Sequence, residues 1–135
     1  MANTIRLEIA TPEAMVYSED VDMVTLPGVE GQMGVLPQHV RLITQLVPGE
    51  LIVHKGGLDD FMAVGEGLIE VTNERVSIVT NMAIAVDKID EAAVEEARQR
   101  AAVRLREKIS SEEVASVNAS LVRSLAQLNV KRRHR

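Results

Sequence analysis

Three histidines and a set of aspartates near turn signals are the residues of this chain whose types could carry acid–base or metal chemistry. No histidine stands at ligand spacing from another histidine or from a carboxylate pair, and the chain has no cysteine. The aspartates lack the longer spacing of a calcium loop, and no G-x-S-x-G motif marks a nucleophile. The sequence therefore predicts no catalytic residue, metal or cofactor site; the residues considered are His39, His54, His134, Asp20, Asp22, Asp59 and Asp60.

A glycine-rich segment is the second place where chemistry could be expected. Gly28, Gly31 and Gly34 permit tight turning and positive φ, which raises the question of a phosphate-binding loop. Such a loop leads into a helix N-terminus, whereas these glycines lead into Val35 and Leu36 and then Pro37. The segment is predicted to bind no nucleotide.

Residues 1–86 show the period-two pattern of half-buried strands, beginning with Ile5, Leu7 and Ile9 between polar residues. Turn signals such as Pro27-Gly28 and Gly56-Gly57 separate short runs without intervening helical stretches, which excludes a parallel Rossmann-type sheet. The pattern predicts an all-β antiparallel sandwich or barrel. The expected strands cover residues 4–10, 21–26, 41–47, 51–54, 61–64, 68–72, 76–80 and 83–86.

The period changes after Lys88, and residues 87–135 are predicted to form an antiparallel two-helix hairpin. Asp90 is placed to cap a first helix over residues 91–108, and Ser110 with Glu113 matches a capping box for a second. The short connection requires the helices to pack side by side. The expected apolar stripes are Val94, Ala97, Ala101 and Leu105, then Val114, Val117, Leu121, Leu125 and Leu128.

Charge follows the same division of the chain. Residues 1–90 carry a net charge of −9 and residues 91–135 a net charge of +4. This asymmetry is explained either by two modules with different partners or by two solvated surfaces. An acidic first domain with only two aromatic residues predicts no nucleic-acid partner. No apolar run approaches the roughly 20 residues that span a bilayer, and no signal peptide is expected.

The most specific segment reads VTLPGVEGQMGVLPQH over residues 24–39. It resembles the L-P-G-x-x-G-x-x-G-[VI]-L-P-x-H signature of the epsilon subunits of F-type ATP synthases. Further segments follow in family order, namely PGEL at 48–51, FMAV at 61–64, GLIEV at 67–71, VSIV at 76–79, ID at 89–90 and LAQLNV at 125–130. The resemblance implies a non-catalytic rotor subunit of the central stalk. It also implies a bacterial source, with a chloroplast origin as the alternative, and for a bacterial chain a peripheral location on the cytoplasmic face of the inner membrane, reached only through the complex.

The resemblance also implies partners. The sandwich of such subunits packs on the gamma subunit and touches the c-ring, and the match places Glu30, Gln32 and His39 at or near that surface. The helical hairpin lies on the sandwich or extends along gamma toward the catalytic beta and alpha subunits and opposes ATP hydrolysis. The basic residues expected to pair with an acidic segment of beta are Arg123, Lys131, Arg132, Arg133 and Arg135. The alternatives are that His39 only caps backbone groups and that the basic tail is only solvated.

Departures from the family pattern limit what carries over. Arg41 and Glu66 stand where the family often has proline and glycine. Some epsilon subunits bind ATP on the hairpin through I-D-x-x-R-A, but Ala93 replaces the arginine that would pair with phosphate. Tight ATP binding is therefore not expected; the alternative is weak binding of regulatory ATP on the hairpin, with Arg98, Arg100 or Arg123 in place of the missing arginine. The main alternative to a synthase subunit is an unrelated sandwich adaptor with a helical arm.

Overall fold

The computed structural model describes residues 3–134, which form ten strands, one short 3-10 helix and two α-helices. All strands lie before Val86 and both α-helices after Asp90, as the change of period predicts. The strands are β1 Ile5–Ala10, β2 Met15–Val21, β3 Met23–Gly28, β4 Gly31–Val35, β5 Leu42–Leu46, β6 Gly49–Lys55, β7 Leu58–Val64, β8 Gly67–Val71, β9 Arg75–Thr80 and β10 Ala83–Ala85. The helices are η1 Val86–Lys88, α1 Glu91–Arg104 and α2 Ser111–Arg133.

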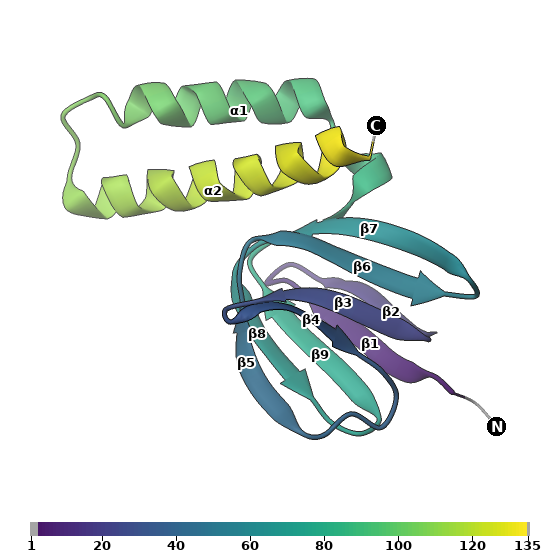
Figure 1. Cartoon of the computed structure of the whole chain (residues 1–135). Helices are drawn as coiled ribbons and strands as arrows, with labels where there is room; N and C mark the ends of the chain where they lie inside the picture. The colour runs from purple at the N-terminus through teal and green to yellow at the C-terminus, as the bar shows by residue number, and fades with distance from the viewer. Residues whose placement is uncertain (1–2, 135) are drawn as a thin grey trace.

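The strands form one hydrogen-bonded sheet that folds over into two layers, in the order β10-β7-β6-β3-β5-β8-β9-β1-β2, with β4 on the other edge of β3 (Figure 1). Strand β3 connects the layers, because its first half pairs with β6 and its last residue pairs with β5. The two helices lie outside the layer that contains β6 and β7 (Figure 1). The predicted β-sandwich followed by a helical hairpin is therefore confirmed.

One pair of strands departs from the expected antiparallel arrangement. Strand β1 pairs antiparallel with β2 on one edge and parallel with β9 on the other. Chain order makes β1 and β2 neighbours, but it contains no signal for the partner on the far edge of β1. That partner is fixed by the closure of the sandwich.

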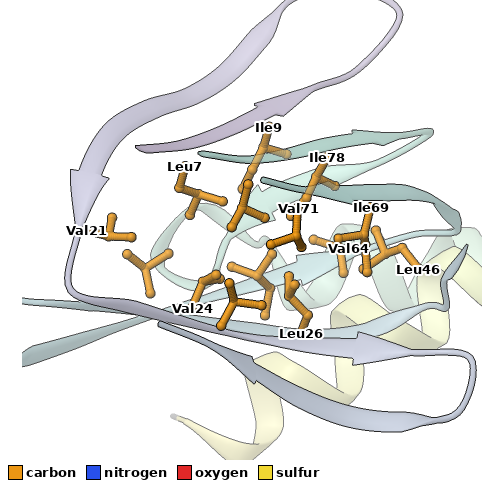
Figure 2. Packing of buried hydrophobic residues seen from close by; sticks show 14 of the residues in the cluster. Leu7, Ile9, Val21, Val24, Leu26, Leu46, Val64, Ile69, Val71 and Ile78 are labelled. Atoms are coloured by element: carbon orange, nitrogen blue, oxygen red, sulfur yellow. The ribbon is translucent and has the colours of Figure 1, made fainter. Parts of the chain in front are cut away.

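The core lies between the two layers and consists of the alternate residues that the period-two pattern selects. Leu7, Ile69 and Ile78 are buried on neighbouring strands, and Val24 and Leu26 face them from β3 (Figure 2). Burying each aliphatic side chain contributes about 1.5–3 kcal/mol. With a single tyrosine and a single phenylalanine in the chain, this core is almost entirely aliphatic.

The sequence pattern does not predict two of the strands. Strand β2 lies at the end of the sheet and buries only Val21, so its residues show no alternation. Strand β4 is glycine-rich and reads as a loop, yet it pairs with β3 along its whole length. The predicted turn at Pro27-Gly28 is wrong, because both residues belong to β3 and the turn is formed by Val29 and Glu30.

The helix caps are those expected from the sequence. The Asp90 carboxylate accepts from the Ala93 backbone N–H at 3.2 Å, and the Ser110 hydroxyl accepts from the Glu113 N–H at 3.1 Å. Helix α1 ends at Arg104, four residues earlier than expected. Leu128 is buried as predicted, but Leu125 is 40% exposed. The second half of α2 contacts both α1 and the sandwich and buries Ser124, Ala126, Leu128 and Val130, so its buried side differs from the predicted stripe.

Candidate functional site: the hairpin dock and the uncovered sheet face

The last turns of α2 pack on the outward face of β6 and β7. Val130 of α2 is buried together with Ala63 of β7 and with Ile89, which follows η1. The alternation of β7 that turns Met62 and Val64 into the sandwich core turns Ala63 and Phe61 outward, toward the hairpin. This second cluster of buried side chains, which we call the dock, joins the two domains; the partly buried members are Phe61, Met82, Ile84, Val86 and Val94.

Polar contacts surround the dock. Glu50 lies at the start of β6, and both of its carboxylate oxygens are in contact with the end of the hairpin. One oxygen is 3.1 Å from the Arg133 guanidinium, and the other is 2.5 Å from His134 Nε2. The His134 ring stacks on Phe61, with centroids 3.7 Å apart and 21° between the planes. The Lys131 ammonium donates to the Val86 carbonyl oxygen at 3.1 Å. These contacts hold the C-terminal end of α2 against the sandwich.

The two helices are joined by an ionic network near the dock. Arg132 of α2 contacts Glu95 of α1 at 3.3 Å, and Arg98 donates to both oxygens of the same carboxylate, at 3.1 and 2.5 Å. Hydrogen bonds from Arg98 lower the pKa of Glu95 to about 2, and Gln99 and Arg132 act in the same direction. At the other end of the hairpin, Arg104 bonds to Glu107 and to Glu113 and thereby links the end of α1 to the start of α2.

The titration of Glu95 tests this network. We expect a pKa of about 2 for Glu95 when its carboxyl carbon is followed by NMR in the full chain. Because this lies below the ordinary value of 4.5, the contacts stabilise the folded hairpin above about pH 4.5, and that stabilisation is lost as the pH falls toward 2. Arg98→Gln should raise the pKa strongly and Arg132→Gln less. A Glu95 pKa near 4.5 in the unaltered chain would contradict the network.

The layer opposite the hairpin presents an uncovered apolar face. Ile43 of β5 is 70% exposed, Leu68 of β8 55% and Val79 of β9 59%. Leu68 and Val79 are direct cross-strand partners, and Ile43 lies on the neighbouring strand on the same face. Exposed apolar side chains gathered on one face make that face a candidate interaction surface. We call Ile43, Leu68 and Val79 the uncovered face.

The residues singled out in the signature segment lie at two separate places. Glu30 is in the turn between β3 and β4 and Gln32 is in β4, and the preceding Val29 N–H donates to Gln45 near the end of β5. His39 lies in the connection that leads to the start of β5, and its Nδ1 is 2.7 Å from the Val40 carbonyl oxygen. The structure therefore puts Glu30 and Gln32 near one end of β5 and His39 near the other.

The backbone of this segment also differs from expectation. Of its three glycines only Gly31 has positive φ, at 121°, where the chain reverses between β3 and β4. Gln38 adopts φ of 65°, an unusual value for a side chain of its size, and its N–H donates to the Asn73 carbonyl at 3.0 Å. That bond ties the connection to the turn between β8 and β9.

Four of the basic residues that were expected to pair with beta lie within the described part of the chain, and three of them bond to other residues of the chain itself. Lys131 bonds to Val86, Arg132 to Glu95 and Arg133 to Glu50. Arg123 lines a groove between α2 and the sandwich together with Pro48 and Glu66. Arg135 lies outside the described residues.

One arrangement resembles an acid–base triad, which the sequence pattern does not predict. His54 of β6 lies between Asp59, at 2.7 Å from its Nδ1, and Thr25, at 2.9 Å from its Nε2. A two-residue Gly56-Gly57 turn makes His54 and Asp59 direct partners, so this half of the contact was predictable from the turn. Thr25 is paired in the ladders with both β4 and β6, so its backbone neighbours supply no oxyanion hole. The arrangement links three strands by polar contacts.

Two further features bear on ligands. Among residues 3–134, no group of three or more His, Cys, Asp or Glu side chains is arranged to hold a metal ion. A cavity of about 590 Å³ beside η1 carries Asp59, Asp60 and Asp87 but only Lys88 as a cation, a balance that does not suit the phosphates of a nucleotide. Within the same residues, no helix is long and apolar enough to cross a membrane.

The architecture defines the class: a β-sandwich protein that carries a helical hairpin on one layer and exposes apolar side chains on the other (Figure 1). Residues 4–86 match the β-sandwich domain of the ATP synthase delta/epsilon chain, and residues 87–132 match its long α-helix domain. The chain belongs to the ATP synthase delta/epsilon family, as an epsilon-type chain.

Individual relatives agree with this assignment. The chain is 43% identical to the ATP synthase epsilon chain of Herpetosiphon aurantiacus over 93% of both chains. It is 39% identical to that of Desulforamulus reducens, over 95% of this chain and 97% of the relative. The fold is similar to a chain in the Euglena gracilis mitochondrial ATP synthase assembly of OSCP, F1 and c-ring, with a TM-score of 0.68 and 24% identity, covering 98% of this chain and 79% of that one.

Proposed function

We propose that the chain is a non-catalytic rotor subunit of the central stalk of a bacterial F-type ATP synthase. In this role it couples ion-driven rotation of the c-ring to ATP synthesis, with a peripheral location on the cytoplasmic face of the inner membrane through the complex. The observation that carries the proposal is a sandwich with the end of α2 packed on one layer and with Ile43, Leu68 and Val79 exposed on the other, in a chain of the epsilon family. A rotor subunit needs such a permanent attachment surface.

The partners follow from the positions of the two surfaces. The gamma subunit packs on the uncovered face, because the apolar side chains of that face are exposed to water in the isolated chain. Glu30 and Gln32 lie near one end of strand β5, which carries Ile43 of the uncovered face, and His39 lies near the other end, so the c-ring contacts only one of these two ends. Neither surface overlaps the dock, so rotor assembly does not require the hairpin to move.

The hairpin is the regulatory part. In the docked state Arg132 and Arg133 are paired with Glu95 and Glu50, so they are not available to the catalytic beta and alpha subunits. When the hairpin leaves the sandwich, Arg133 is released from Glu50, and when its two helices also separate, Arg132 is released from Glu95. These guanidinium groups and Arg123 then become available to an acidic segment of beta and oppose ATP hydrolysis. Single exposed ion pairs contribute about 0–1 kcal/mol, so several are needed to bias the equilibrium. No cofactor takes part in this mechanism.

Truncation separates the two roles. A chain ending at Val86 keeps every strand and loses α1 and α2. We expect it to co-elute with gamma in size exclusion, and to raise steady-state ATP hydrolysis of the reconstituted catalytic head by at least about fivefold relative to the full chain, the low end of typical coupling between two sites.

A charge-matched pair of full-length variants provides the control. Replacing Arg123, Arg132 and Arg133 with glutamine should relieve inhibition as truncation does, because the basic side chains are removed and the helices are kept. Replacing Arg100, Arg106 and Lys108 removes the same charge from the first helix and the connection, and should have little effect. If hydrolysis were equally inhibited with and without the hairpin, the regulatory proposal would be wrong.

A further inference from the structure

Glu50 occupies an unusual position for a carboxylate. Its side chain is only 11% exposed, and both of its oxygens are used by the last residues of α2. A carboxylate so withdrawn from water is costly unless cations and donors compensate for the lost hydration. In this chain the compensation comes from Arg133 and His134, which lie more than 80 residues further along the chain. The energetics of Glu50 and the docking of α2 are therefore coupled.

His134 is the second partner of the Glu50 carboxylate. Its ring is held between Phe61 and Glu50, and its Nε2 is the atom that meets the carboxylate. Histidine is the side chain whose charge normally changes between pH 5 and 8. A neutral imidazole gives Glu50 one ordinary hydrogen bond, whereas an imidazolium adds a positive charge at the same place.

The other charged groups near the His134 ring do not reverse the effect that a positive charge on this ring has on its contact with Glu50. Glu50 of β6 is the acid in contact with it, and Asp59 of β7, two positions before Phe61, is already engaged by His54. On α2 itself, Arg133 shares Glu50 and Lys131 is directed to the Val86 carbonyl. On η1, Asp87 and Lys88 line the cavity that Phe61 also lines, and their charges oppose each other. Glu50 therefore dominates the surroundings of His134.

We propose that Glu50 is the anchor that holds the helical hairpin on the sandwich, and that protonation of His134 tightens this hold, so that docking strengthens as the pH falls from 8 to 5.5. One consequence of this proposal rests on the proposed function, namely that the chain does not inhibit ATP hydrolysis while the hairpin is docked. The anchor itself is a property of the isolated chain. It competes with the acidic partner of the tail, because Arg133 cannot serve Glu50 and an external carboxylate at once.

Thiol protection in the isolated full chain measures docking. The chain has no cysteine, so an Ala126→Cys variant carries a single thiol, and its rate of modification can be measured without interference. Ala126 is buried and lines a groove beside Pro48 and Gly49, so its thiol reacts when α2 leaves the sandwich. Ala115→Cys, on an exposed position of the same helix, gives the reference rate at each pH and corrects for the thiolate fraction. The ratio of the two rates is the protection of the dock.

The expected results are specific. Protection should rise about threefold between pH 8 and pH 5.5 in the unaltered background. Glu50→Gln should lower protection about tenfold and remove the pH dependence, because the near-isosteric amide no longer offers a charge. His134→Gln should remove the pH dependence and keep part of the protection, since Arg133 still reaches Glu50. Arg133→Gln should lower protection and keep the pH dependence.

Two controls make the test decisive. Glu13→Gln removes an exposed carboxylate from the same domain, and His54→Gln removes a histidine that lies outside the dock. Both should leave the protection and its pH dependence unchanged. His134→Gln and Arg133→Gln change the partners of Glu50 at the end of the helical hairpin and leave the sandwich unaltered. They therefore test the anchor even if Glu50→Gln disturbs the sandwich. Protection that is independent of pH in the unaltered chain, or equal in Glu50→Gln and Glu13→Gln, would overturn the proposal.

The same variants separate the anchor from the regulatory proposal. If Glu50→Gln frees the hairpin in the protection assay and also strengthens inhibition of ATP hydrolysis in the reconstituted head, both stand. If it frees the hairpin and leaves hydrolysis unchanged, the anchor stands and the regulatory role fails. If protection does not respond, the anchor fails regardless of the hydrolysis result.

Discussion

Replacing both Leu68 and Val79 with aspartate should abolish binding of the chain to the gamma subunit while leaving the chain folded. These partners on β8 and β9 form the centre of the uncovered face and are more than half exposed, so the sandwich core does not depend on them. Two carboxylates placed in an apolar contact would be buried without partners. Truncating a central interface residue typically costs about 2 kcal/mol or more, so we expect the dissociation constant to rise at least about 100-fold.

Leu58→Asp is the matched control for this prediction. Leu58 is 74% exposed at the start of β7, in the layer that carries the hairpin. The same apolar-to-acidic change there should leave the affinity for gamma within about threefold, since surface substitutions away from a contact have small effects. Calorimetry with purified gamma measures both affinities. If the double variant bound gamma as tightly as the unaltered chain, the uncovered face would not be the attachment surface.

Gly67→Ala should be among the most destabilising single substitutions of the sandwich. A Cβ atom at Gly67 would lie 1.9 Å from the Val79 carbonyl oxygen and 2.8 Å from the Thr80 Cα, which are backbone atoms of the paired strand β9. Neither can move without shifting the ladder between β8 and β9. We expect the free energy of unfolding to fall by about 2–3 kcal/mol, as for other overpacked sites, with a lower urea midpoint measured by circular dichroism.

Gly65→Ala tests whether the effect comes from the backbone clash. A Cβ at Gly65 also meets an atom at 1.9 Å, but that atom is the side-chain oxygen of Asn81, which can rotate away. We expect a loss below about 1 kcal/mol. Equal losses in the two variants would show that glycine is needed at both positions for a reason other than the approach of β9.

Local sequence signals determined the order and the type of most elements. The alternation that starts at Ile5 buries the residues it selects, and Asp90 and Ser110 cap the helices they were expected to cap. The Gly56-Gly57 turn fixed the register that makes His54 and Asp59 partners. These features depend on residues within a few positions of each other, so periodicity, capping and turn chemistry are sufficient to reveal them.

The tertiary structure alone decided which of these local pieces meet. The parallel pairing of β1 with β9, the edge strand β2 and the exposure of Leu125 all follow from how the sandwich closes and where α2 lies on it. The contact of Glu50 with His134 joins residues 84 positions apart. Such contacts leave no periodic trace in the sequence, because burial and pairing there are set by the packing of whole domains rather than by neighbouring residues.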